Sequence, residues 1–122
     1  MSLVERIDRG AICRLLLNRP SRLNVLSDNL LNALQEELDS VNKSNNIRCV
    51  IISGAGNGFC AGHDLKEMTK QRQNPDGGVG YFQDLFVRCS KMMTTIQSLP
   101  QPVIAQVHGI ATAAGCQLVA SC

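Results

Sequence analysis

The sequence predicts an α/β fold in which short strands alternate with amphipathic helices. Two sequence patterns, the 2-residue period of strands and the 3.6-residue period of helices, follow one another in the order β-β-α-β-α-α-β-α. The run Cys49–Ile52 is wholly apolar, which is typical of an inner parallel strand covered on both faces. Together these patterns indicate right-handed crossovers between parallel strands, and ligands in such sheets bind beyond the carboxyl ends of the strands.

The first elements are a hairpin and a helix. Leu3–Asp8 and Ala11–Leu17 alternate as strands around Arg9-Gly10, a pair typical of a tight turn. Ser27 is a favoured helix N-cap and precedes an acidic first turn. The following apolar residues recur at helical spacing and predict one buried face, formed by Leu30, Leu31, Leu34, Leu38 and Val41.

The later elements alternate in the same way. Gly54–Gly58 predicts a turn, His63–Thr69 a short helix and residues 81–98 a longer one. Pro100 and Pro102 then precede a strand at Val103–Val107, which we expect to be buried, and a last helix runs to Cys122. The expected inward face of the long helix consists of Phe82, Leu85, Phe86, Cys89, Met92, Met93 and Ile96.

Composition excludes several classes of protein. The chain has 122 residues, which predicts one domain at most, and a formal net charge of +2. One Tyr, no Trp and no basic stripe argue against nucleic-acid binding, and no apolar run reaches the roughly 20 residues of a membrane span. None of the six cysteines forms a C-x-x-C pair, and Cys49 and Cys116 lie in apolar runs, so we expect structural thiols in a reducing compartment.

Two turns rich in small residues follow strands and suggest a binding site. One is Phe59-Cys-Ala-Gly-His-Asp-Leu65, and the other begins at His108 and opens the last helix. Ala and Gly at a helix start leave backbone N–H groups exposed, and the helix dipole favours negative charge there. If the turns meet, two preset N–H groups could stabilise one developing oxyanion, although simple packing turns remain the alternative.

These turns, together with Asn18-Arg-Pro and Asn24-Val-Leu26, resemble the motifs of the crotonase (enoyl-CoA hydratase/isomerase) superfamily. The second turn contributes Val107-His-Gly109 and Ala114-Gly-Cys-Gln-Leu118. The resemblance implies a crotonase-like spiral of ββα units. It covers only the N-terminal half of a family domain, so we expect residues 1–122 to be a partial domain, an expectation strengthened by the uncapped last helix.

The resemblance also implies roles for particular residues. The amides of His63 and Ala114 would donate to a thioester oxygen and stabilise an enolate formed from an acyl-CoA. The loop Ser21–Asn24 would flank the coenzyme, and the other implied contacts with substrate are Asn24, Ala61, Asp64, Leu65 and Lys66. No further cofactor or metal is implied, and Cys60 with His63 is too small a set for a metal site. The family implies a homotrimer or hexamer and a mitochondrial location.

The sequence departs from the family pattern at three places. Gln117 stands where family hydratases carry a catalytic Glu, and an amide does not titrate in the useful range. Ala113 and Ala114 replace common glycines, so a positive φ at Ala114 would cost about 1 kcal/mol. His63 replaces a usual Ala, although only its amide is needed; we expect its side chain to be partly exposed. His108 is expected to be a hydrogen-bonded structural histidine.

Three functions fit these residues. The favoured one is an acyl-CoA binder of fatty-acid metabolism that lacks two-glutamate hydration, because Gln117 offers no carboxylate. The second is an active acyl-CoA isomerase, hydratase or hydrolase that uses the amide pair with an acid or base outside this segment. The third is a non-catalytic assembly subunit. Whether the chain is an enzyme stays open at this point.

Overall fold

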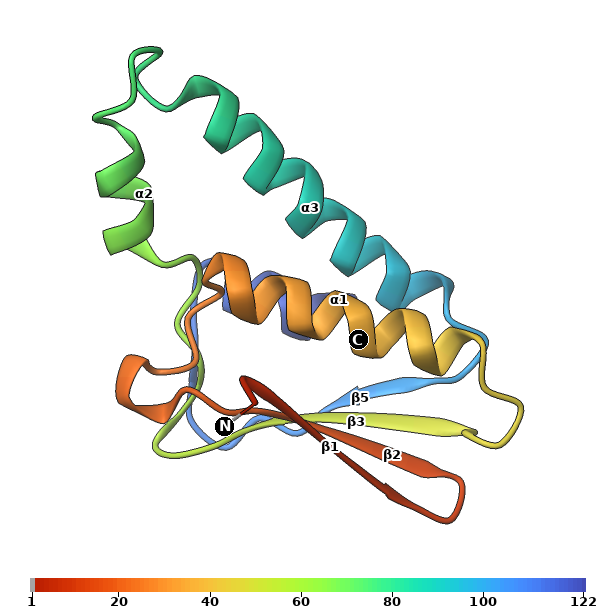
Figure 1. Ribbon diagram of the computed structural model, residues 1–122. Helices are drawn as coiled ribbons and strands as arrows, with labels where there is room; N and C mark the ends of the chain where they lie inside the picture. The colour runs from red at the N-terminus through yellow and green to blue at the C-terminus, as the bar shows by residue number, and fades with distance from the viewer. Residues whose placement is uncertain (1) are drawn as a thin grey trace.

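Helices cover one face of a four-stranded sheet in the computed structural model, which describes residues 2–122 (Figure 1). The sheet has the order β1-β2-β3-β5, in which β1 and β2 form an antiparallel hairpin and the remaining neighbours are parallel. The mixed α/β architecture is the predicted one. The strands of this sheet are β1 (Val4–Arg9), β2 (Ile12–Leu17), β3 (Cys49–Gly54) and β5 (Val103–Ala105).

Helix α1 (Asp28–Asn42) packs on the sheet through the predicted face. The Oγ atom of Ser27 accepts a hydrogen bond from the N–H of Leu30 at 3.2 Å, which confirms the predicted N-cap. The apolar residues of the helix are almost fully shielded from solvent: Leu30, Leu31, Leu34, Leu38 and Val41. This face and the inner sides of β1 to β3 form the centre of the hydrophobic core.

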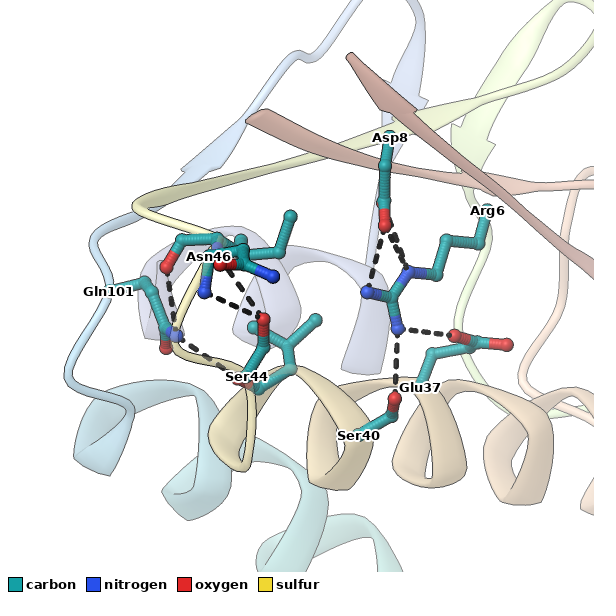
Figure 2. A network of polar contacts seen from close by, with 9 residues as sticks. Arg6, Asp8, Glu37, Ser40, Ser44, Asn46 and Gln101 are labelled. Atoms are coloured by element: carbon teal, nitrogen blue, oxygen red, sulfur yellow. Dashed lines mark hydrogen bonds and ion pairs between the residues drawn. The ribbon is translucent and has the colours of Figure 1, made fainter. Parts of the chain in front are cut away.

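Polar side chains tie the hairpin to α1 at its outer edge (Figure 2). Arg6 donates to Asp8 at 3.0 Å, to Ser40 at 2.9 Å and to Glu37 at 3.4 Å. These contacts bind β1 to α1 on the solvent side. Deeper in the protein, the Nε2 of Gln101 donates to the carbonyls of Val41 and Ile47 and so joins the end of α1 to the loop before β5 (Figure 2).

A second sheet, which the sequence did not predict, consists of β4 (Gly58–Cys60) and β6 (Ile110–Ala111). The two strands are parallel, and Gly58 pairs with Ile110. Both are shorter than the four residues a strand pattern needs to show alternation. Each continues the chain beyond a parallel strand of the main sheet, so this sheet carries both turns that the sequence analysis singled out.

Three further helices complete the described chain: α2 (Leu65–Gln71), α3 (Val79–Ser98) and α4 (Ala114–Ser121). Helix α3 lies across α1, and its N-terminal end diverges from α1 toward α2 (Figure 1). The short helix starts at Leu65 rather than at His63, because Asp64 is its N-cap. The loop from Asn18 also contains a turn of 3₁₀ helix, Pro20–Arg22.

Two predictions about burial are wrong. Phe86 was placed on the inward face of α3, yet it is 51% exposed, because the apolar stripe facing α1 is narrower than predicted and runs through Leu85, Cys89, Met92 and Ile96. The strand predicted as buried at 103–107 ends at Ala105, and Ile104 is 52% exposed. Ile104 pairs with Ile51 of β3, and their side chains lie on the face of the sheet that no helix covers among the described residues (Figure 1).

The cysteines are all free thiols in the described chain. Cys13, Cys60 and Cys89 are buried, and burial raises the pKa of each, to about 12 for Cys13. Cys116 is exposed on α4, so the apolar run around it did not indicate a buried structural thiol. The structural role predicted for cysteines therefore holds for the three buried thiols.

Candidate functional site

The two small-residue turns meet at the ends of β4 and β6. The N–H of Thr112 donates to the carbonyl of Cys60 at 3.1 Å. A Cβ atom placed on Gly62 would lie 3.0 Å from Cβ of Ala113 and 3.4 Å from the backbone nitrogen of Ala114. The turn Ala61-Gly62-His63 therefore touches the first residue of α4, as the oxyanion hypothesis requires.

Two glycines permit this close approach. A Cβ on Gly115, in the first turn of α4, would lie only 2.1 Å from the carbonyl oxygen of Cys60. A Cβ on Gly109 would come equally close to the carbonyl oxygen of Asn57, which precedes β4. Backbone atoms cannot yield to such contacts, so both glycines are required for the second sheet and α4 to pack together.

The N–H groups of His63 and Ala114 are the two donors that the oxyanion hypothesis needs. Ala114 is the first residue of α4, where an N–H has no partner within the helix. Within residues 2–122, neither of these two N–H groups donates to a main-chain carbonyl. Neighbouring groups are held, since Leu26 donates to the carbonyl of Gly62 at 2.7 Å and Ala61 donates to that of Leu23 at 3.0 Å. The loop around His63 is thus tied on both sides of the free amide.

Backbone strain in the second turn lies at Ala113, not at Ala114. Ala113 is the N-cap of α4 and has φ 52° and ψ −125°, a conformation that favours glycine. Ala114 has no positive φ and is an ordinary helical start. The replacement of glycine at position 114 therefore carries no backbone cost, and the replacement at position 113 does.

The side chain of His63 is half-buried against α3. Its ring meets that of Phe86 edge-on, with centroids 5.7 Å apart and an interplanar angle of 61°. The Nδ1 atom is buried and has no hydrogen-bond partner within the described residues. Burial lowers the pKa of His63 from its ordinary value of 6.5, so the ring is neutral at physiological pH.

Asp64 and Asn24, which the resemblance places near the coenzyme, use their side chains within the protein. Asp64 is 4% exposed; its carboxylate caps α2 through the N–H of Lys66 at 3.0 Å and pairs with Arg22 at 3.2 Å and Arg19 at 3.7 Å. Asn24 is fully buried, accepts from the N–H of Arg19 and donates to two carbonyls of the loop before β4. Both side chains therefore fix the loops around the His63 turn, and their predicted contact with substrate stays a prediction.

The remaining predicted contacts are accessible. Leu65 is 72% exposed, and with Lys66 it forms part of a shallow groove along α2. Ala61 is half-buried beside the free amide of His63. The Nε2 of His108 donates to the carbonyl of Gly56, 2.6 Å away, which confirms its predicted role as a hydrogen-bonded structural histidine.

Gln117 is exposed on α4 and faces α3 across a groove. The groove holds no carboxylate and no imidazole within the described part of the chain; its lining is Phe86, Ser90, Met93, Thr94, Gln97, Gln117, Ala120 and Ser121. Among the described residues, the lining of this groove therefore offers Gln117 no acid or base that titrates near neutral pH. In the same part of the chain, no three metal-ligating side chains gather into a potential metal site.

Sequence reasoning missed the arginine pair and the contact of Phe86 with His63. Arg22 and Asp64 are 42 residues apart in the chain, and a pattern of single residues does not indicate such a pairing. The only signal for this pairing in the sequence was the pair of basic residues, Arg19 and Arg22, around Pro20. Phe86 was noticed, but its expected place was the core rather than the site.

Both the sequence and the fold of this chain match known proteins. The sequence pattern described as "Enoyl-CoA hydratase/isomerase" matches residues 12–122. The chain belongs to the enoyl-CoA hydratase/isomerase family. This confirms the resemblance, and the family's fold class is confirmed by a solved enoyl-CoA hydratase of Mycobacterium smegmatis, which is 48% identical with a TM-score of 0.90 over 98% of this chain and 45% of that one.

Two longer relatives are similar to this chain over most of its length. The mitochondrial enoyl-CoA hydratase domain-containing protein 3 of Xenopus laevis is 47% identical over 91% of this chain and 36% of its own length. The 1,2-epoxyphenylacetyl-CoA isomerase of Escherichia coli (strain K12) is 35% identical over 95% of this chain and 43% of its own. The chain thus spans less than half the length of these relatives.

Among the described helices, none has the length and apolarity to cross a membrane.

Proposed function

We propose that this chain binds acyl-CoA thioesters by donating two hydrogen bonds, from the amides of His63 and Ala114, to the thioester oxygen. The observation that supports this proposal is the contact of Gly62, the residue before His63, with the first residue of α4, together with the absence of main-chain partners for the amides of His63 and Ala114 among residues 2–122. Membership of the enoyl-CoA hydratase/isomerase family supports the choice of ligand.

Two preset N–H groups suit a thioester for a physical reason. Removal of the α-proton of an acyl-CoA moves negative charge onto the carbonyl oxygen, and donors that are already aligned stabilise that charge without reorganising. Loss of one such donor costs about 3 kcal/mol in the barrier of enzymes that use this device. The same two bonds hold the uncharged thioester more weakly, which is enough for binding without turnover.

We further propose that the chain lacks two-glutamate hydration of enoyl-CoA. Gln117 occupies the position of a catalytic carboxylate in the family resemblance, and the groove around it offers no other titratable side chain within residues 2–122. General acid–base catalysis contributes roughly 10²–10⁴ in rate, so its loss leaves negligible hydration. By the same resemblance, we propose a role in fatty-acid metabolism, a mitochondrial location and a homotrimeric or hexameric assembly.

An active isomerase is the second candidate. The 1,2-epoxyphenylacetyl-CoA isomerase that the chain resembles favours it, since isomerases with the same pair of amides need no carboxylate at position 117. The third candidate, a pure assembly subunit, predicts no ligand at all.

Calorimetry and a hydratase assay separate these candidates. We expect heat of binding from acetyl-CoA and from a medium-chain enoyl-CoA, whereas absence of heat from both leaves only the assembly role. We expect negligible hydration by the parent chain, with any gain confined to Gln117→Glu. Robust hydration by the parent would contradict the proposal, and rearrangement of the double bond without hydration would favour the isomerase.

A further inference from the structure

Asp28, the first residue of α1, contacts both α2, which follows His63 in the chain, and α3, which carries the ring packed on His63. Its backbone N–H donates to Oε1 of Glu67 at 2.9 Å, and Glu67 stands in the first turn of α2, just after the His63 turn. Its carboxylate accepts from the hydroxyl of Tyr81 at 3.1 Å and from Nη2 of Arg88 at 2.7 Å, both on α3. Helices α1, α2 and α3 therefore meet at this one residue.

Further hydrogen bonds hold the contact between Asp28 and α3 in place. Arg88 also donates to Asp84 at 2.7 Å and to Asn32 at 3.2 Å, which fixes the guanidinium between α3 and α1. Burial and the negative charge of Asp28 raise the pKa of Tyr81 to about 12, so its hydroxyl remains a donor throughout the neutral range. These bonds lie toward the end of α3 that diverges from α1 (Figure 1), where they hold the two helices together.

Phe86 belongs to the same helix as the two partners of Asp28. It lies between Tyr81 and Arg88 in α3, and it reaches His63 with a centroid distance of 5.7 Å while remaining 51% exposed. A half-exposed ring is not held by the core, so the position of α3 decides whether it covers His63. The buried Nδ1 of His63 has no hydrogen-bond partner within the described residues, so no hydrogen bond from that atom fixes the ring beside Phe86.

We propose that Asp28 is a positioning residue of the thioester site. By binding Tyr81 and Arg88, Asp28 keeps Phe86 packed on the His63 ring. This packing fixes the His63 peptide, whose N–H donates to the thioester in the proposed function. Asp28 touches no ligand and acts only through His63. The inference rests on the proposed function as far as the ligand is concerned, whereas the link from Asp28 to His63 stands on the contacts above.

The first test needs no ligand and follows the His63 ring by NMR titration in the 122-residue chain. The variants are Asp28→Ala and the milder Asp28→Asn, which keeps an acceptor for Tyr81 but loses the charge that binds Arg88. Asp8→Ala is the matched control, because it removes the 3.0 Å ion pair with Arg6 at the hairpin, away from the site (Figure 2). We expect the His63 pKa to rise toward 6.5 in both Asp28 variants and to stay at its parent value in the control.

The second test measures the bound thioester directly. Acetyl-CoA carrying ¹³C at the thioester carbonyl is observed by infrared difference spectroscopy, since donors to the oxygen lower the stretching frequency. We expect most of the shift seen with the parent to be lost in Asp28→Ala, part of it in Asp28→Asn and none in Asp8→Ala.

The outcomes separate the two proposals. An unchanged His63 pKa in both Asp28 variants, or an unchanged carbonyl frequency in an Asp28 variant that still binds, overturns the positioning role. Absence of acetyl-CoA binding by the parent instead contradicts the proposed function, and the His63 titration then decides alone whether Asp28 positions His63.

Discussion

At the scale of single residues, Ala113 is the residue whose conformation least suits its side chain. Its φ of 52° and ψ of −125° lie in a region that costs a non-glycine residue of order 1–3 kcal/mol. Glycine removes this strain but loses about 0.5–1 kcal/mol through the greater freedom of the unfolded chain. We therefore expect Ala113→Gly to raise the free energy of unfolding by about 1 kcal/mol in urea titrations.

The matched control for this substitution is Ala120→Gly, on an exposed position of α4 with ordinary helical geometry. There glycine should lower the free energy of unfolding by about 1 kcal/mol. If Ala113→Gly destabilises the protein as Ala120→Gly does, the strain assigned to Ala113 is not present in solution.

His63 makes stability depend on pH. Burial lowers its pKa in the folded chain below the 6.5 of the unfolded chain, so the unfolded chain binds the proton more readily. The contribution of the neutral ring is therefore intact above pH 6.5 and is lost as the pH falls through the folded-state pKa. We expect the urea midpoint to fall between about pH 7.5 and about pH 5.5, and to fall less in His63→Gln. Equal falls in the two proteins would contradict the burial of His63.

At the scale of elements, the junction of β4 and α4 decides whether the two turns can meet. A methyl group on Gly115 would lie 2.1 Å from the carbonyl oxygen of Cys60, so α4 would have to move away from β4. We expect Gly115→Ala to lower the free energy of unfolding by about 3 kcal/mol or more, since overpacking against backbone is costly. The loss is measured by chemical denaturation.

The control for this junction is Gly77→Ala in the loop before α3, where the added methyl group meets no atom within 4 Å. Its φ of +70° still disfavours alanine, so the expected loss is about 1 kcal/mol and reflects backbone conformation alone. A loss for Gly115→Ala no larger than that of the control would show that α4 does not pack closely on β4.

Elements that depend on local sequence were predictable, and those that depend on distant partners were not. The cap at Ser27 and the buried face of α1 follow from neighbouring residues, and both are present. Strands β4 and β6 exist because Gly58 lies opposite Ile110, a pairing that neither short segment shows by itself. The exposure of Phe86 was missed because the periodicity of α3 does not reveal which of its apolar residues face α1.

At the scale of the whole molecule, the parallel sheet determines where the site forms. Val50 of β3 lies opposite Val103 of β5, so the two strands end side by side and pass their chains into β4 and β6. The turns were predictable as candidates from their small residues, and the family motifs predicted their partnership. The ion pairs of Asp64 with the two arginines and of Asp28 with Arg88 were not predictable, because they join charges from separate loops and helices.

The most direct test of the central claim follows the backbone amides by ¹H–¹⁵N NMR during titration with acetyl-CoA. If both donors bind one carbonyl, the amide protons of His63 and Ala114 shift downfield together and saturate with the same Kd, and coenzyme A without the acyl group leaves both largely unmoved. Titration in which acetyl-CoA binds but only one of these two amides responds, or neither does, would contradict the account.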